Sequence, residues 1–118
     1  MTVLCVAAGG VAGVLARYGL GTLFSTDRLP ALTVAINVVG SFALGLVVAV
    51  GHELPAAVRT GLAVGLLGGF TTFSTFSVDV FLDIETGRPG EAFLYLAASV
   101  LVGVAAAAAG YYAGRAVV

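Results

Sequence analysis

Polar side chains able to bind an ion gather in two stretches of this chain that are otherwise apolar. Thr33, Asn37 and Ser41 are spaced four residues apart, so they share one face of a helix. Residues 68–77 mix glycines and hydroxyl residues with phenylalanines. Amide and hydroxyl groups donate hydrogen bonds, and the edge of a phenylalanine ring carries the positive part of its quadrupole. Groups of this kind favour an anion over a cation.

No titratable side chain accompanies these groups. Tyr95 and Ser99 add hydroxyls in another apolar stretch, but no stretch has Asp, Glu, His or Lys at its centre. Proton-coupled transport needs a titratable relay inside the membrane, so the pattern indicates passive conduction of an anion. Simpler roles stay open, because a buried amide such as Asn37 can merely join two helices by a hydrogen bond, and phenylalanines can merely pack.

The composition is typical of a membrane protein. Of the 118 residues, 60% are hydrophobic and 9% are charged, and the mean hydropathy is +1.14. A soluble domain carries about 25% charged residues, so this chain lacks the polar surface of a soluble globule. The net charge of −1 argues against nucleic acid as a partner, because such binding needs a clustered basic patch. The single cysteine, Cys5, allows no internal disulfide and no cysteine metal cluster.

Four apolar segments are long enough to cross a membrane: residues 3–23, 31–50, 55–84 and 91–117. We therefore predict an all-α membrane protein with one four-helix transmembrane domain over residues 1–118. The run 68–77 lies inside the third segment and predicts a break in that helix near the membrane midplane. Gly68 and Gly69 are expected to supply the backbone freedom for the break. The first segment lacks the basic start of a signal peptide and is expected to remain as a helix.

Small residues recur at four-residue spacing in all four segments. In lipid such rows let helix backbones approach closely, and we expect most of them only to pack helices together. A bundle of four helices this short has little interior of its own, which predicts association with further subunits. The rows are formed by Gly9, Gly13, Ser41, Gly45, Gly61, Gly65, Gly69, Gly110 and Gly114.

The positive charges are nearly balanced across the membrane. The chain has no lysine. With four crossings, Arg59 and Arg115 lie on one side and Arg28 and Arg88 on the other, with Arg17 near the latter side. Because the Lys/Arg bias sets orientation, the sequence barely specifies which way the protein inserts. Either it inserts in both orientations and pairs as an antiparallel dimer, or another signal orients it, and the count does not decide between the two.

Three blocks of the sequence resemble the signature blocks of the Fluc (CrcB) fluoride channels. They are residues 9–18 (GGVAGVLARY), residues 37–42 (NVVGSF) and residues 68–76 (GGFTTFSTF). The blocks occur in the order that the family has, and the resemblance covers essentially the whole chain. The third block is highly specific, whereas the first alone would be weak.

The resemblance implies an assembly and a cofactor. It implies an antiparallel, dual-topology homodimer in the plasma (inner) membrane of a bacterium, with fluoride pathways along the subunit interface. Some members of the family work instead as pairs of homologous subunits, and one sequence does not distinguish the two forms. The resemblance also implies a structural sodium ion on the two-fold axis, bound by the main-chain carbonyls of Gly68 and Thr71.

The resemblance further assigns roles to individual side chains. Arg17 and Asp79 would lie in the vestibule of the pathway. Asp79 stands where the family pattern usually has Glu, and Gly103 stands where a serine is expected. The fluoride pathway itself would be lined by Asn37, Phe73, Phe76, Ser74, Thr75, Tyr95 and Ser99.

The function expected from residues and resemblance together is passive export of fluoride by a selective channel, which lowers cytoplasmic fluoride. One alternative is a small dual-topology multidrug exporter, which would need a membrane-embedded carboxylate that the first segment lacks. A second is a non-transporting structural subunit, which would leave the run 68–77 without a purpose. An enzyme is not expected, because the sequence offers no nucleophile–base pair and no metal cluster.

Overall fold

The computed structural model describes residues 1–24 and 30–118, so Arg28 and the polar link around it lie outside the described residues. Within the described part, four helices are long and apolar enough to cross a membrane. The all-α prediction with four apolar helices is therefore confirmed. The elements are α1 (Thr2–Leu23), α2 (Pro30–Val50), η1 (Gly51–Glu53), α3 (Ala56–Thr60), η2 (Gly61–Leu67), α4 (Gly68–Phe70), α5 (Phe73–Glu85) and α6 (Pro89–Arg115).

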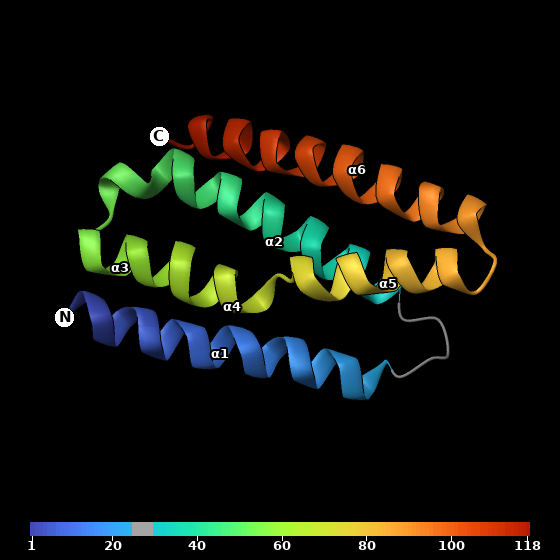
Figure 1. Cartoon of the computed structure of the whole chain (residues 1–118). Helices are drawn as coiled ribbons and strands as arrows, with labels where there is room; N and C mark the ends of the chain where they lie inside the picture. The colour runs from blue at the N-terminus through green and yellow to red at the C-terminus, as the bar shows by residue number, and fades with distance from the viewer. Residues whose placement is uncertain (25–29) are drawn as a thin grey trace.

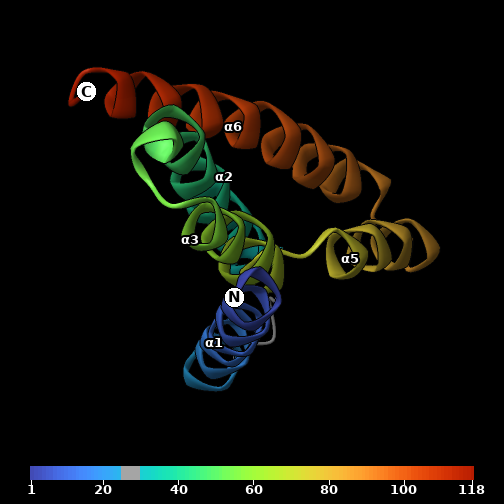
Figure 2. The same cartoon turned by 90° about the vertical axis from the view of Figure 1, so that its left-hand side faces the viewer.

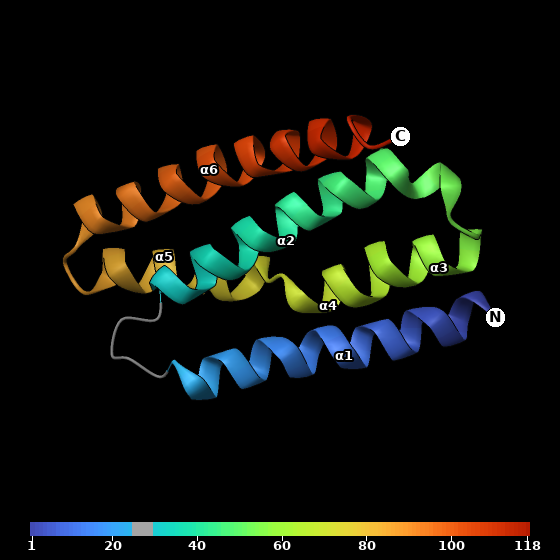
Figure 3. The ribbon, with the colours of Figure 1, turned by 180° about the vertical axis from the view of Figure 1, so that it is seen from behind.

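The helices lie side by side in a flat bundle, and both chain termini lie at the same end of it (Figures 1 and 3). The principal extents are 49 × 28 × 20 Å. α6 runs along α2, and α1 runs along the first half of the third span. Among the described residues, no large side chain is less than 2% exposed. A single subunit thus has almost no interior, and most of its apolar surface faces lipid or another protein.

Small residues bring the helix backbones together in two pairs. In the pair formed by α1 and the first half of the third span, a Cβ added at Gly69 would lie 2.9 Å from the Gly10 carbonyl oxygen. A Cβ added at Gly65 would lie 3.0 Å from Val6 Cα. In the α2–α6 pair, a Cβ at Gly110 would lie 3.1 Å from the backbone nitrogen of Leu46. Only hydrogen fits at such positions. The prediction that rows of small residues pack helices is confirmed for these pairs.

The third span is interrupted at Thr71 and Thr72. α3, the wider π-helical segment η2 and α4 form its first half, and α5 forms its second half. Thr71 (φ −79°, ψ 158°) and Thr72 (φ −148°, ψ 114°) have extended backbones between them. Figure 2 shows α5 displaced sideways from the axis of α3.

Glycine conformation does not cause the break, so the expectation of special backbone freedom at Gly68 and Gly69 is wrong. Gly68 has helical angles (φ −64°, ψ −36°). Among the described residues only Gly87 has a positive φ, of 79°. Close packing requires glycine at Gly69, because a Cβ there would meet α1, whereas a Cβ at Gly68 has nothing nearer than 3.8 Å.

A tight turn returns the chain from α5 to α6. Gly87 adopts the left-handed conformation in this turn, and the Arg88 guanidinium forms an ion pair with Asp83, with 2.6 Å between Nη2 and Oδ1. The Asp83 side chain is largely buried. The turn lays the start of α6 against α5, which places Tyr95 beside the first turns of α5.

Candidate functional site

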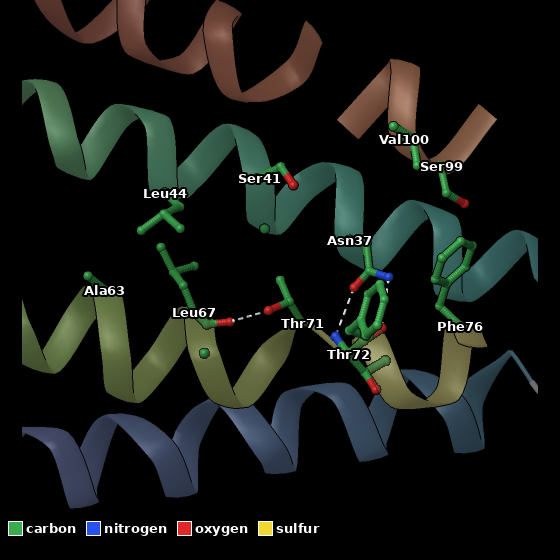
Figure 4. A pocket seen from close by; sticks show the side chains of 13 residues that line it. Asn37, Ser41, Leu44, Ala63, Leu67, Thr71, Thr72, Phe76, Ser99 and Val100 are labelled. Atoms are coloured by element: carbon green, nitrogen blue, oxygen red, sulfur yellow. Dashed lines mark hydrogen bonds between the residues drawn. The ribbon is translucent and has the colours of Figure 1, made fainter. Parts of the chain in front are cut away.

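Asn37 joins α2 to the break in the third span. Its Nδ2 donates to the Thr72 carbonyl oxygen at 3.0 Å, and its Oδ1 accepts from the Thr72 N–H at 2.8 Å (Figure 4). The amide therefore pairs with Thr72 as a neighbouring peptide group would. The helix–helix hydrogen bond that the sequence left open for Asn37 is present. This pairing fixes the orientation of the amide. Because Nδ2 has two hydrogens and Thr72 takes one, the other remains for another acceptor.

Arg17 reaches the same break from α1. Its Nε donates to the Gly69 carbonyl oxygen across 3.2 Å, and the side chain is half-buried. From the resemblance, Arg17 is expected in the vestibule of the pathway. The structure places it against the backbone just before the extended residues Thr71 and Thr72.

The two threonines at the break use their own hydroxyls locally. Thr71 Oγ1 donates to the Leu67 carbonyl oxygen at 2.9 Å, and the Thr71 N–H donates to that same oxygen at 3.0 Å. Thr72 Oγ1 accepts from the Thr75 N–H at 3.3 Å, which makes Thr72 the N-cap of α5. The helix restarts at Phe73 because this hydroxyl replaces the missing backbone acceptor.

Two carbonyl oxygens at the break remain free within the described part of the chain. The hydrogen bonds given above use the carbonyls of Leu67, Gly69 and Thr72, and none ends on the carbonyl of Gly68 or Thr71. Free carbonyl oxygens suit a hard cation. The described residues contain no group of three or more His, Cys, Asp or Glu side chains that could hold a metal, so main-chain oxygens are the donors that this site offers.

A groove of about 310 Å³ opens beside the break, between α2, the third span and α6 (Figure 4). Its lining includes four of the predicted pathway residues and both residues whose carbonyls are the predicted sodium ligands. The hydroxyl oxygen of Ser99 is buried and has no hydrogen-bond partner within the described residues. The groove is lined by Asn37, Gly40, Ser41, Leu44, Ala63, Leu67, Gly68, Thr71, Thr72, Phe73, Phe76, Ser99 and Val100.

The Phe73 and Phe76 rings line the groove, whereas Tyr95 contacts Phe76 but is not among the lining residues. The ring centroids of Phe73 and Phe76 are 5.8 Å apart, and Phe76 meets Tyr95 edge to face at 5.1 Å. Phe76 is 6% exposed, whereas Phe73 is 78% exposed. Tyr95 in turn donates to the Asp79 carboxylate at 3.4 Å. Phe76 is therefore fixed by its neighbours, while Phe73 projects from the subunit.

Some predicted residues lie outside the groove, and some groove residues were not predicted. Ser74 and Thr75 are exposed and do not line it. Thr72 and Gly40 line it but were not assigned a role. An N-cap residue before a helix restart is a signal that could have found Thr72. Gly40 follows Asn37 by three residues on the same helix face, and a Cβ there would collide with the Thr71 methyl group.

Comparison with known proteins gives consistent matches over nearly the full length. A family model described as CrcB-like protein, Camphor Resistance (CrcB), matches residues 4–111. The "Fluoride-specific ion channel FluC" of Rhodospirillum centenum is 46% identical over 123 residues, covering 98% of this chain and 94% of that relative. The protein of the same name from Thermus thermophilus is 42% identical over 120 residues, covering 98% and 96%.

Proposed function

The chain belongs to the CrcB-like family, and from this membership we infer that it is a fluoride-specific ion channel of a cell membrane. The observation that supports this function most directly is the groove at the break. Amide, hydroxyl and phenylalanine side chains line it, and no carboxylate is among its lining residues. Such a surface attracts a small anion and has no titratable group for proton coupling.

Fluoride would pass along this groove in exchange for its water. The ion is small and strongly hydrated, so each water lost must be replaced by a protein donor. Such donors are the remaining Nδ2–H of Asn37 and the hydroxyl of Ser99, which has no partner among the described residues. The edges of Phe73 and Phe76 supply weaker positive charge. Ser41 adds a further hydroxyl to the lining.

Passive conduction is enough for export. A cell in acidic surroundings takes up neutral HF, which ionises in the less acidic cytoplasm. The trapped anion then leaves down its own gradient through an open pathway, so neither a proton relay nor a catalytic site is required.

We propose that the conducting form is an antiparallel dimer with a structural sodium ion at its two-fold axis. The free carbonyls of Gly68 and Thr71 support a cation site, and two from each subunit would give four oxygen ligands. The exposure of Phe73 (78%), Val78 (55%) and Phe81 (58%) supports a second subunit over this part of the third span. A paired homologous subunit would meet the same surface.

The alternatives lack a specific supporting observation. A proton-coupled multidrug exporter would need a carboxylate in its first helix, and Thr2–Leu23 contains no Asp or Glu. A purely structural subunit would not need a groove that gathers hydrogen-bond donors beside a helix break.

Fluoride efflux from liposomes that contain only this purified protein tests the proposed function. Fluoride should leave rapidly once the membrane potential is clamped by valinomycin, and chloride should stay inside under identical conditions. Retention of fluoride would contradict a homomeric channel. Efflux that returns on adding a co-expressed homologous subunit would indicate the paired form instead.

Dual topology is tested separately by labelling. A single cysteine placed at the C-terminus, with Cys5 replaced, should react with a membrane-impermeant thiol reagent in about half of the molecules in intact cells, as equal insertion in both orientations requires. Labelling of nearly all or nearly none of the molecules would exclude an antiparallel homodimer of this chain.

A further inference from the structure

The break in the third span is bound from two opposite sides by side chains of other helices. Arg17 of α1 binds the carbonyl of Gly69, just before the extended residues. Asn37 of α2 binds both polar groups of the Thr72 peptide, at the end of the extended residues. In Figure 4 the broken span lies between α1 below and α2 above. The two side chains thus hold either end of the interruption.

We propose that Arg17 and Asn37 act together as positioning residues, a clamp that holds the third span in its broken form and thereby leaves the Gly68 and Thr71 carbonyls free. The proposal rests on the proposed function in one respect, because the free carbonyls are taken to receive a cation. It assigns Arg17 to the backbone of the break rather than to attraction of ions into a vestibule.

The clamp prevents an alternative hydrogen bond between Thr72 and Gly68. In a continuous α-helix the Thr72 N–H would donate to the Gly68 carbonyl, since each N–H bonds to the carbonyl four residues earlier. Asn37 Oδ1 takes that N–H instead, at 2.8 Å. Without Asn37, the Thr72 N–H would have no side-chain acceptor and could bond to the Gly68 carbonyl. One of the two free carbonyls would then be lost.

The same competition occurs one residue later, at the Gly69 carbonyl. A continuous helix would bond the Phe73 N–H to the Gly69 carbonyl. The Arg17 Nε occupies this oxygen with a charge-assisted hydrogen bond, and Thr72 caps the new helix that begins at Phe73. The clamp therefore satisfies Gly69 and Thr72 from outside the span. It leaves the carbonyl of Gly68, the residue before Gly69, without a partner in the described part of the chain.

The surroundings of the Arg17 and Asn37 hydrogen bonds make both of them hard to replace. Both are at least partly buried within the subunit, where lipid offers no replacement for a lost partner. The glycine contacts of η2 hold α1 against the first half of the span, so the backbone of Arg17 has a fixed position relative to the break. Asn37 lies on α2, which packs along α6 and is likewise fixed.

The experiment measures two properties of purified protein in lipid nanodiscs: hydrogen–deuterium exchange of a peptide covering residues 67–76, and the sodium concentration that gives half of the maximal thermal stabilisation. The variants are Arg17→Gln, Arg17→Lys, Asn37→Ala and Asn37→Asp. Arg115→Gln is the matched control for loss of an arginine, because Arg115 is exposed at the end of α6. Thr60→Val is the control for loss of a side chain–backbone bond elsewhere in the third span.

We expect Arg17→Gln and Asn37→Ala each to change exchange in residues 67–76 and to raise the required sodium concentration by roughly tenfold, the effect of losing one such hydrogen bond. Asn37→Asp keeps an acceptor for the Thr72 N–H but turns an acceptor toward the Thr72 carbonyl, so it should fall between Asn37→Ala and the unchanged protein. Arg17→Lys keeps one donor and should also be intermediate. The two control variants should match the unchanged protein in both measurements.

Unchanged exchange and unchanged sodium dependence in Arg17→Gln, with fluoride flux reduced, would overturn the clamp and return Arg17 to a purely electrostatic role. If the unchanged protein shows no sodium dependence, the cation site is wrong, and exchange alone then decides the clamp. Should Arg17→Gln or Asn37→Ala fail to fold, the intermediate positions of Arg17→Lys and Asn37→Asp decide it, because equality with the controls overturns it.

Discussion

The two halves of the third span are held in the bundle by opposite means. Before the break, η2 and α4 contact α1 backbone to backbone, through glycines that leave no room for a side chain. After the break, α5 contacts α6 through Phe76 and Tyr95, and the Thr72 peptide group just before α5 binds the Asn37 side chain of α2. Within the described part of the chain, the only side-chain hydrogen bond between α1 and the first half is the one at the break, from Arg17 to the Gly69 carbonyl oxygen.

The first half of the third span therefore supports the break, and the second half carries side chains that line the groove. Close backbone packing against α1 fixes the first half, because any atom added at its glycines would overlap α1. The first half thereby keeps the break in place. The second half has fewer contacts with the other helices and carries the Phe73 and Phe76 rings that line the groove. A channel needs both: a rigid support for the free carbonyls, and side chains that can exchange water for an anion. Substitutions on either side of the break test this division.

The largest effect is expected from Gly65→Ala, in the first half. A Cβ there would lie 2.5 Å from the Val6 carbonyl oxygen and 3.0 Å from Val6 Cα, both backbone atoms that cannot turn away. We expect a loss of about 3 kcal/mol or more in stability, at the upper end of overpacking costs, and poor recovery of folded protein. Thermal unfolding in detergent measures this.

Gly19→Ala is the matched control for that substitution. Gly19 is also in a spanning helix, but a Cβ added to it meets nothing within 4 Å. Alanine also favours a helix over glycine by up to about 1 kcal/mol, so Gly19→Ala should be neutral or stabilising. Equal stability of the two variants would show that α1 and the third span are not in close backbone contact.

The next largest effect is expected from Asn37→Asp, which acts on the break. The carboxylate cannot donate to the Thr72 carbonyl, and it places negative charge in the groove. Fluoride efflux from liposomes should fall by roughly tenfold or more, since an unsatisfied buried partner costs about 1–3 kcal/mol. The dimer should still elute normally in detergent. Unchanged efflux would mean that Asn37 only joins α2 to the third span.

Much of this division was open to prediction from the sequence, and the part that was not has a physical reason. Hydropathy and length predict four apolar helices, and small residues at four-residue spacing predict the close contacts of Gly65 and Gly69. The mixed run 68–77 predicts a break because hydroxyls and glycine pairs are unusual at that depth. These features depend on local composition or on one helix face.

The partners across helices were not predictable in the same way. Periodicity shows that Thr33, Asn37 and Ser41 share a face, but the axial offset between α2 and the third span decides that Asn37 meets Thr72. The same holds for Arg17 and Gly69, which are 52 residues apart in the chain. The backbone of the break was predicted for the wrong cause, because its extended residues are threonines rather than glycines.

A smaller effect is expected from Phe73→Ile, in the second half. Phe73 is 78% exposed in the subunit, so the stability of the isolated fold should hardly change. Isoleucine keeps much of the bulk but removes the ring edge, and edge contacts are worth about 0.5–1.5 kcal/mol. Fluoride efflux should therefore fall by roughly two- to tenfold, because 1.4 kcal/mol corresponds to a factor of about ten.

Phe76→Ile distinguishes conduction from packing in that pair. Phe76 is 6% exposed and contacts Tyr95, so its replacement should lower the melting temperature as well as the flux. A melting temperature that falls in Phe73→Ile as much as in Phe76→Ile would contradict the placement of Phe73 on the uncovered surface.

The smallest effect is expected from Thr71→Ser, although Thr71 lies at the centre of the break. Serine keeps the hydroxyl that donates to the Leu67 carbonyl oxygen, a bond that the Thr71 N–H makes to the same oxygen. It loses one methyl group, which packs against Gly40 and is worth about 0.8 kcal/mol at most. Both stability and sodium dependence should stay close to those of the unchanged protein, because the proposed ligand is the carbonyl and not the side chain. Thr71→Val removes the hydroxyl and keeps the methyl group, and it should be equally mild. A larger loss of flux in Thr71→Ser than in Phe73→Ile would place the Thr71 side chain in the pathway. The side chains that line the pathway would then begin at Thr71, before α5.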